Sequence, residues 1–172
     1  RGGREALHGA GGEGYAGEAA TVNATPGIPA LMDVDADGHN DLLVFGDMAG
    51  RLWALDLVTG LPVAGGPVYT VDGAVAAPIG AGVAVKDNRV FFGTGGVAHA
   101  DPNRAYAVYA LAIFADGAAL LWSYELASGE RVWSAPVLDS AGNLLFATGI
   151  NYLPEQFSPE LSYAGRLVGL SA

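Results

Sequence analysis

The stretch that decides the fold is residues 42–56, which read LLVFGDMAGRLWALD from Leu42 to Asp56. Two short, mostly apolar runs, 42–46 and 51–56, lie on either side of a turn that ends at Gly50. Glycine permits the backbone conformations that tight turns require, and short apolar runs bounded by turn residues are typical of strands. We therefore predict two neighbouring strands that are joined by the turn at 48–50.

The same pattern occurs three times from residue 28 onward. Prolines open the three copies, and they are 49 and 58 residues apart (Pro29, Pro78 and Pro136). The second strands end at Phe45-Gly46, Phe92-Gly93 and Phe146-Ala147, and the third strands of the first and last copies, each preceded by Gly-Arg, are Leu52–Leu55 and Leu167–Leu170. Repeats of about 40 to 50 residues with several strands each are typical of β-propeller blades. The sequence therefore predicts an all-β fold with about three propeller-type blades.

The repeats divide the chain into a Gly-rich leader or arm, residues 1–27, and a blade domain, residues 28–172. Two segments interrupt the period and are interpreted as insertions on one rim, at about 97–104 and 151–163. Propellers close with about four to eight blades, so three blades leave faces and edges uncovered. We expect the chain to be part of a larger or multi-chain assembly, completed by a protein partner or by copies of itself. Residues 1–27 or 151–172 are expected to contact another chain or a part of the protein outside this sequence. The alternative is that the leader folds back and closes a small β domain.

Composition excludes several classes of protein. Of the 172 residues, 51% are hydrophobic and 15% are charged, which excludes a disordered chain. The apolar runs are shorter than the roughly 20 residues of a membrane span. Eighteen acidic residues against eight basic ones give a net charge of −10, which disfavours a nucleic-acid partner. Because cysteine is absent, disulfides, zinc–thiolate sites and cysteine nucleophiles are excluded.

An acidic loop is the strongest functional signal in the sequence. Residues 33–41 read DVDADGHND, with Asp33, Asp35 and Asp37 at alternate positions and Gly38 next. Calcium takes six to eight oxygen ligands, and acids at loop positions 1, 3 and 5 followed by Gly at position 6 are typical of its binding loops. The carbonyl of His39 would supply position 7, and Asp41 would close the cage at position 9. We therefore predict a Ca²⁺ site formed by Asp33, Asp35, Asp37, His39 and Asp41.

The loop differs from an EF-hand, because position 12 is Val44 where an EF-hand has Glu. It is interpreted as a shortened calcium loop between strands. Four carboxylates within nine residues would repel one another without a cation. Another divalent ion, or a solvated turn without any ion, is the alternative.

No catalytic group of residues is predicted. The three histidines, His8, His39 and His99, are far apart in the sequence, and a pairing of His99 with Asp101 is interpreted as a surface contact. Asp47 is expected to accept a hydrogen bond or to cap a turn rather than to bind a metal. Aromatic residues at strand positions are expected to pack in the core (Phe45, Trp53, Phe92, Trp122, Trp133 and Phe146). Those of the second insertion either anchor a partner or fold back over the blade (Tyr152, Phe157 and Tyr163).

Two segments resemble quinoprotein-type propeller repeats, in which Ala-x-Asp and Thr-Gly are followed by a strand that ends in Trp. Residues 53–60, WALDLVTG, match the first half of such a repeat, and Tyr109-Ala110-Leu111, Asp116-Gly117 and Leu121-Trp122 match more loosely. The resemblance implies that Trp122 packs between adjacent blades. It does not imply quinone binding, because many non-enzymes share the fold.

Residues 28–150 as a whole resemble the C-terminal propeller of the type IV pilus tip protein family. That family combines a DxDxDxxxD calcium loop, a Gly-Asp-x-x-Gly-x-Leu-Trp strand and a Phe-x-Gly-Thr-Gly strand, and here residues 33–41, 46–53 and 91–95 match in the same order. The acidic loop followed by Leu42-Leu43-Val44 also resembles an FG-GAP repeat of integrin-like propellers.

These resemblances imply a non-enzymatic, calcium-stabilised module for adhesion or pilus assembly, in a bacterial protein that is exported to the cell surface or beyond it. One alternative is a structural subunit of an extracellular filament assembled through open blade edges. The other is a fragment of a quinoprotein-type dehydrogenase, which would need a complete ring and a quinone pocket.

Overall fold

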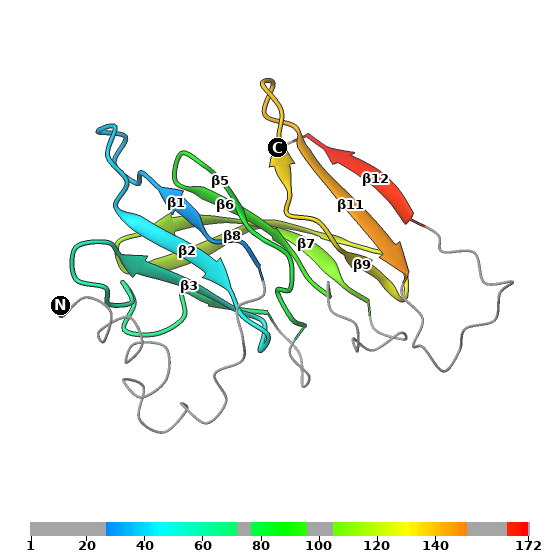
Figure 1. Ribbon diagram of the computed structural model, residues 1–172, viewed down its shortest axis with the longest axis horizontal. Coiled ribbons are helices and arrows are strands. Elements are labelled where there is room, and N and C mark those ends of the chain that lie inside the picture. Colours follow the sequence, from blue (N-terminus) through cyan, green and yellow to red (C-terminus); the bar gives the residue numbers. More distant parts are fainter. Residues whose placement is uncertain (1–26, 72–76, 96–104, 151–164, 172) are drawn as a thin grey trace, which may run out of the picture.

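The computed structural model describes residues 27–71, 77–95, 105–150 and 165–171, which form an all-β fold (Figure 1). Twelve strands lie in these ranges, and the described residues contain no helix. None of the described residues therefore belongs to a helix long and apolar enough to cross a membrane. The predicted leader, apart from Gly27, and both predicted insertions lie outside the described residues. The all-β prediction is confirmed.

Three antiparallel sheets contain the strands. Sheet 1 consists of β1 (Ala30–Met32), β2 (Leu42–Gly46), β3 (Arg51–Asp56) and β4 (Tyr69–Thr70) in that order. Sheet 2 consists of β5 (Ala84–Lys86), β6 (Arg89–Gly93), β7 (Ala107–Phe114) and β8 (Gly117–Glu125). Sheet 3 consists of β10 (Val137–Leu138), β11 (Leu144–Ile150) and β12 (Gly165–Leu170), and β9 (Glu130–Val132) pairs with the same edge of β11 as β10 does. Antiparallel sheets of about four strands that follow the chain in order are typical of propeller blades, and three such sheets occur in the described residues, so the prediction of propeller-type blades is confirmed.

The strand registers define the equivalent residues of the three sheets. Ala30, Ala84 and Val137 occupy equivalent positions in the three sheets. Their strand partners, which are Val44, Phe91 and Leu145, each lie two residues before the aligned Gly46, Gly93 or Ala147. Pro29 and Pro136 precede this position, but sheet 2 has Val83 there. The alignment of Pro78 with the other two prolines is therefore wrong. Pro78 lies in the segment that leads into sheet 2, where its carbonyl accepts a hydrogen bond from the Gly95 N–H at 2.8 Å.

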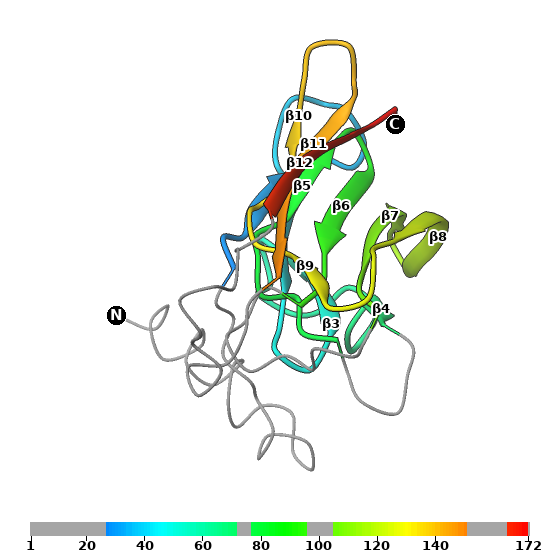
Figure 2. The same ribbon diagram turned by 90° about the vertical axis from the view of Figure 1, so that its right-hand side faces the viewer.

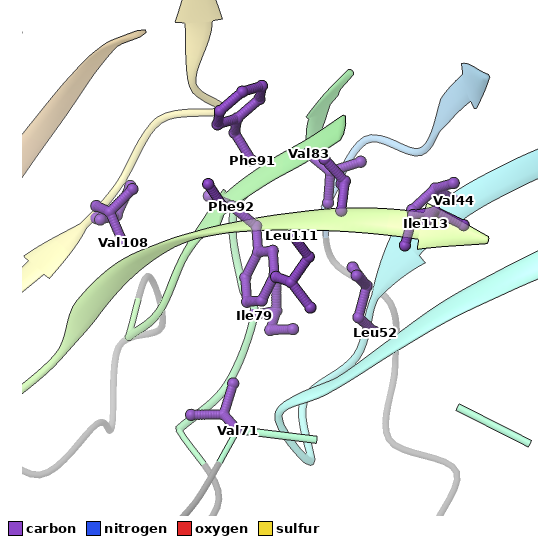
Figure 3. Close-up of a cluster of buried hydrophobic side chains, with 14 of the residues drawn as sticks. Val44, Leu52, Val71, Ile79, Val83, Phe91, Phe92, Val108, Leu111 and Ile113 are labelled. Atoms are coloured by element: carbon purple, nitrogen blue, oxygen red, sulfur yellow. The ribbon is translucent and has the colours of Figure 1, made fainter. Parts of the chain in front are cut away.

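Sheet 2 lies between the other two sheets (Figures 1 and 2). Its first strand, β5, contacts β1 on one side and β10 on the other. Against sheet 1, the Phe92 ring lies 6.5 Å from the Tyr69 ring and stacks on Tyr109 at 5.2 Å. On the other face of sheet 2, Phe91 packs against Trp122 with ring centroids 6.2 Å apart. Figure 3 shows buried side chains of this core converging between the strands.

A small residue allows close packing at each of the two interfaces between sheets. A Cβ on Gly46 would lie 2.2 Å from Cγ2 of Ile79, and a Cβ on Gly93 would lie 2.3 Å from Cγ2 of Val132. Each β-branched residue also donates its backbone N–H to the carbonyl that follows the glycine, Ile79 to Asp47 at 3.0 Å and Val132 to Thr94 at 3.1 Å. The same contact therefore joins sheet 1 to sheet 2 and sheet 2 to sheet 3.

The predicted aromatic core is confirmed for Phe92 and Phe146, which are fully buried. It is wrong for Phe45 and Trp53, which are half-buried on the face of sheet 1 that points away from sheet 2. Trp122 packs on the face of sheet 2 that bears Phe91, and that face adjoins sheet 3, as the resemblance implied. Core packing is wrong for Trp133, which is 39% exposed and donates its indole N–H to the Gly149 carbonyl at 3.2 Å. It lies on the outer face of sheet 3, because its neighbour Val132 points inward to Gly93.

Within the described ranges, sheet 3 has one strand position fewer than the other sheets. Sheets 1 and 2 have a fourth strand, β4 and β8, beyond their third, whereas β12 pairs only with β11 among the described residues. The three sheets are not closed into a ring (Figure 1). Sheets 1 and 3 therefore each have an outer face that no described sheet covers.

Candidate metal centre

The acidic loop connects β1 to β2 and projects beyond the ends of these two strands (Figure 1). The Asp41 N–H donates to the Met32 carbonyl at 2.8 Å, which closes the base of the loop. Ala36 has a φ of 61° and Gly38 a φ of 91°, so the backbone turns through the left-handed region twice. A non-glycine residue adopts this conformation at a cost, and the surrounding loop must hold Ala36 there.

Three of the predicted ligands are brought together. Carboxylate oxygens of Asp33, Asp35 and Asp37 all lie within 4.8 Å of one another. Backbone N–H groups of the loop orient them: Gly38 donates to Asp33 Oδ2 at 2.8 Å, and Asp37 donates to Asp35 Oδ1 at 3.1 Å. The His39 N–H donates to Asp37 Oδ1 at 2.8 Å. The turn of the loop thus directs three negative charges to one place.

The remaining oxygen of Asp33 tests whether a cation fits this group. Asp33 Oδ1 is buried and has no hydrogen-bond partner within the described part of the chain. A buried carboxylate oxygen without a partner is costly, and like charges this close repel each other. A divalent cation between the three carboxylates would relieve both costs, and oxygen donors are the ligands that calcium takes. The residues present therefore fit a calcium ion.

The other two predicted ligands stay predictions. Asp41 is not a member of the close group, and its Oδ2 accepts a hydrogen bond from the Val34 N–H at 2.9 Å. This bond, together with that from the Asp41 N–H to Met32, holds the two ends of the loop together. His39 is exposed, and the role of its carbonyl as a ligand is likewise a prediction.

The equivalent turn of sheet 3 holds its acid in a different way. Asp139 Oδ1 accepts hydrogen bonds from the N–H groups of Ala141 at 2.9 Å and Asn143 at 2.8 Å, and the Asn143 side chain donates to Oδ2 at 2.8 Å. These bonds, above all those from Asn143, lower the pKa of Asp139. Both carboxylate oxygens are therefore occupied within the turn, which makes it a capped turn and not a second cation loop.

Asp47 caps a turn, as the sequence analysis expected. Its buried carboxylate accepts the N–H groups of Ala49 and Arg51 at 2.8 and 3.0 Å. It also accepts Arg51 Nε at 2.7 Å and the indole N–H of Trp53 at 3.0 Å. The Gly-Asp-x-x-Gly-x-Leu-Trp motif is thus a turn whose acid binds the two side chains that follow it.

Sequence reasoning missed one buried acid. The Glu130 carboxylate in β9 accepts hydrogen bonds from Nε and Nη2 of Arg166, at 2.5 and 2.6 Å. It also accepts one from the Thr148 hydroxyl at 2.5 Å. The Arg166 side chain, followed by the Thr148 hydroxyl, lowers the pKa of Glu130 to about 2 against the opposing effect of burial. No local pattern could reveal a partner that lies 36 positions away. Its carboxylate is engaged by an ion pair that joins β9 to β12, so it stabilises sheet 3.

His8, His99 and Asp101 lie outside the described residues. Ser134 accepts the Ala147 N–H at 2.9 Å, which ties the segment before β10 to β11.

Comparison with known proteins yields likenesses among solved structures. No protein-family model matches the chain, and no curated protein matches it. A quinohemoprotein alcohol dehydrogenase from Pseudomonas putida HK5 is similar at 19% identity over 63% of this chain and 19% of that one, with a TM-score of 0.49. The tricorn protease is similar at 15% identity over 81% of this chain and 13% of that one, with a TM-score of 0.43. BamB from Moraxella catarrhalis is similar at 14% identity over 75% of this chain and 47% of that one, with a TM-score of 0.34.

This chain therefore spans less than half the length of each of these structures. The resemblance to the type IV pilus tip family stays a prediction.

Proposed function

We propose that this chain is a non-enzymatic β-propeller module, stabilised by calcium, that acts in adhesion or pilus assembly outside a bacterial cell. The observation that supports calcium binding is the convergence of three carboxylates with the buried, partnerless oxygen of Asp33. The surface and pilus role is supported by the order of the motifs at 33–41, 46–53 and 91–95.

Calcium fits this loop better than magnesium does. Calcium accepts six to eight oxygens at about 2.3–2.6 Å in irregular arrangements, whereas magnesium demands a near-ideal octahedron and keeps several waters. The loop supplies carboxylates from alternate positions and has a strained backbone at Ala36, which suits an irregular cage. We therefore expect calcium to bind at least tenfold more tightly than magnesium, a difference of about 1.4 kcal/mol.

Binding at the loop would stabilise sheet 1. The Leu57 N–H donates to the Asp41 carbonyl at 2.8 Å, so the loop contacts the end of β3 as well as joining β1 to β2. A ligand that binds only the native state stabilises it by about 2.7 kcal/mol at 100 times its dissociation constant. The proposed role of the ion is therefore to fix the three strands β1, β2 and β3 in register.

Calorimetric titration with CaCl₂ after chelation tests the site. One ion per chain should bind, and the melting temperature should rise with calcium. Asp35→Ala should remove most of that rise, because it removes a central carboxylate of the group. Asp116→Asn is the matched control, since it removes one exposed negative charge outside the loop and should keep the full calcium response.

Two results would contradict the proposal. Identical melting curves in chelator and in calcium would contradict the proposed calcium site. An absorption band of a bound quinone in the protein purified from its native source would contradict the non-enzymatic role and favour the dehydrogenase alternative.

A further inference from the structure

Both outer faces of the stack of sheets are apolar. Alternate residues of sheet 1 point away from sheet 2 and form the sheet 1 outer face, which consists of Leu31, Leu43, Phe45, Trp53 and Leu55. The corresponding sheet 3 outer face consists of Trp133, Val137, Leu145, Ala147 and Leu167. Leu31 is 49% exposed, Val137 60% and Leu167 74%. Contiguous exposed apolar residues of this kind mark an interaction surface.

Equivalent residues show what covers the sheet 1 outer face. Phe45, Phe92 and Phe146 occupy the same position in the three sheets and point toward the preceding sheet. Phe92 is 0% exposed and Phe146 is 1% exposed, because sheets 1 and 2 precede them. Phe45 is only half-buried, because no described sheet precedes sheet 1. A preceding sheet is thus the missing neighbour.

The same comparison applies to the other end. Val44, Phe91 and Leu145 occupy one position and point toward the following sheet. Val44 and Phe91 are fully buried, whereas Leu145 is only half-buried. Ala147 takes the place of Gly46 and Gly93, which admit a β-branched side chain of the next sheet, so its methyl group fills part of that space. The half-buried Leu145 still marks the sheet 3 outer face as one that a following sheet would cover.

We propose that a second copy of this chain covers both faces, with the sheet 3 outer face of each copy packed on the sheet 1 outer face of the other. The two outer faces carry apolar residues at the positions that pack at the two internal interfaces, with Ala147 in place of the glycine, so a copy of the chain carries both surfaces. Two chains that each contribute the three described sheets give six, which lies within the roughly four to eight blades at which propellers close. The proposal rests on the blade architecture and not on calcium.

Head-to-tail packing has a specific signature in a mixing experiment. Leu31→Glu places a charge on the sheet 1 outer face, and Leu167→Glu places one on the sheet 3 outer face. Burying an unpaired carboxylate is costly, so each variant alone should dissociate at least tenfold more readily than the unchanged chain. An equal mixture should associate again, because each variant keeps the intact face that the other needs. Sedimentation velocity at micromolar concentration, in constant calcium, measures all three samples.

Controls separate association from folding. Val58 is 94% exposed but lies in the turn after β3, outside both faces, so Val58→Glu should leave association unchanged. Circular dichroism confirms that each variant is folded. Because the chain has no cysteine, Leu31→Cys and Val137→Cys give a second readout that does not disturb the faces with charge. Both lie on first strands, and a short bifunctional maleimide should link the mixture of the two variants and not either one alone.

The proposal is overturned if the unchanged chain sediments as a monomer at micromolar concentration. It is also overturned if Leu167→Glu dissociates while Leu31→Glu stays a dimer, because that result means identical faces pack together. Species larger than a dimer that vanish with both variants would keep the head-to-tail contact and replace the ring by a filament. Loss of calcium binding with unchanged association would affect only the proposed calcium site.

Discussion

The Glu130 carboxylate shows how one residue can make the fold depend on pH. Its pKa is lowered to about 2 by the Arg166 side chain first and by the Thr148 hydroxyl next. A carboxyl whose pKa is lower in the folded than in the unfolded protein stabilises the fold when ionised. That contribution is fully present above the unfolded pKa of about 4.5 and is lost as pH falls toward 2.

Glu130→Gln should therefore lower the free energy of unfolding at pH 7 by about 1–3 kcal/mol, because the Arg166 guanidinium loses a charged partner. The variant should also show less change in stability between pH 4.5 and pH 2 than the unchanged chain does. Urea denaturation across this pH range measures both effects. Glu125→Gln, an exposed acid of β8, is the control. Parallel pH profiles for Glu130→Gln and the unchanged chain would show that the ion pair is too weak to matter.

Replacing Asp33 should change the stability of the protein in opposite directions in the presence and in the absence of calcium. Asp33→Asn removes a negative charge from a cluster of three and from a buried oxygen without a partner. In chelator the variant should be as stable as the unchanged chain or more stable, since repulsion falls. In calcium it should be less stable, since the ion loses a ligand. Thermal melting in both buffers measures this crossing of the two curves.

The control for Asp33 is another acid at an equivalent turn. Asp139→Asn weakens hydrogen bonds to the Asp139 carboxylate, whose ionised form they favour. It should lower the melting temperature equally with and without calcium. A loss confined to the calcium buffer would mean that Asp139 takes part in ion binding.

These residues also show what a sequence can reveal at this scale. Asp33, Asp35 and Asp37 are close in the chain, so their spacing predicts that they meet, and they do. Glu130 and Arg166 meet only because β9 and β12 lie on opposite edges of β11. Such a pair depends on the registers of three strands, which no local motif encodes.

Among the elements, the contact between Gly93 and Val132 determines how closely sheets 2 and 3 approach. A Cβ at Gly93 would lie within 2.3–2.6 Å of three carbon atoms of Val132. Gly93→Ala should thus destabilise the protein by about 1–3 kcal/mol, the usual cost of overpacking. Val132→Ala should destabilise less in the Gly93→Ala background than in the unchanged chain, because the added methyl group occupies the space it vacates.

Chemical denaturation of the four proteins in this double-mutant cycle measures the coupling. Gly66→Ala is the control, since a Cβ at Gly66 would have no neighbour within 4 Å. Additive effects of Gly93→Ala and Val132→Ala would contradict the close contact.

Element prediction from the sequence succeeded where the signal was local and failed where it was not. The predicted runs at 42–46 and 51–56 form strands β2 and β3. Strand β12 contains the predicted segment 167–170 and begins two residues earlier, at Gly165. The alignment of the second proline was wrong, because Pro78 lies in a segment that crosses between sheets. Val83 occupies the position before β5 instead. A proline marks an extended segment, but only the strand pairing tells which extended segment it is.

The whole molecule combines a strong negative charge with a local cluster of acids. The three-blade count could be predicted from the sequence because the repeats share Phe-Gly and Phe-Ala pairs. The similarity of the two outer faces to the surfaces at the internal interfaces could not be predicted from the sequence. It depends on which side of each sheet Phe45 and Leu145 occupy. The acidic residues act in two ways: all of them contribute to the net negative charge of the molecule, and those of the loop also form the proposed ion site. An experiment must therefore distinguish general charge repulsion from binding of the ion.

Salt and calcium should therefore stabilise the protein in different ways. With a net charge of −10, the folded chain repels itself at low ionic strength. Raising NaCl shortens the screening length from about 30 Å at 0.01 M to about 8 Å at 0.15 M, so in chelator the melting temperature should rise with NaCl. At fixed ionic strength, calcium should raise it further, because three converging carboxylates bind the ion directly. A variant with Asp33→Asn, Asp35→Asn and Asp37→Asn should keep a reduced response to NaCl, since most acids remain, and should lose the response to calcium. If NaCl and calcium chloride at equal ionic strength gave the same rise in the unchanged chain, screening alone would account for the stabilisation, and the carboxylates of the loop would be a solvated turn.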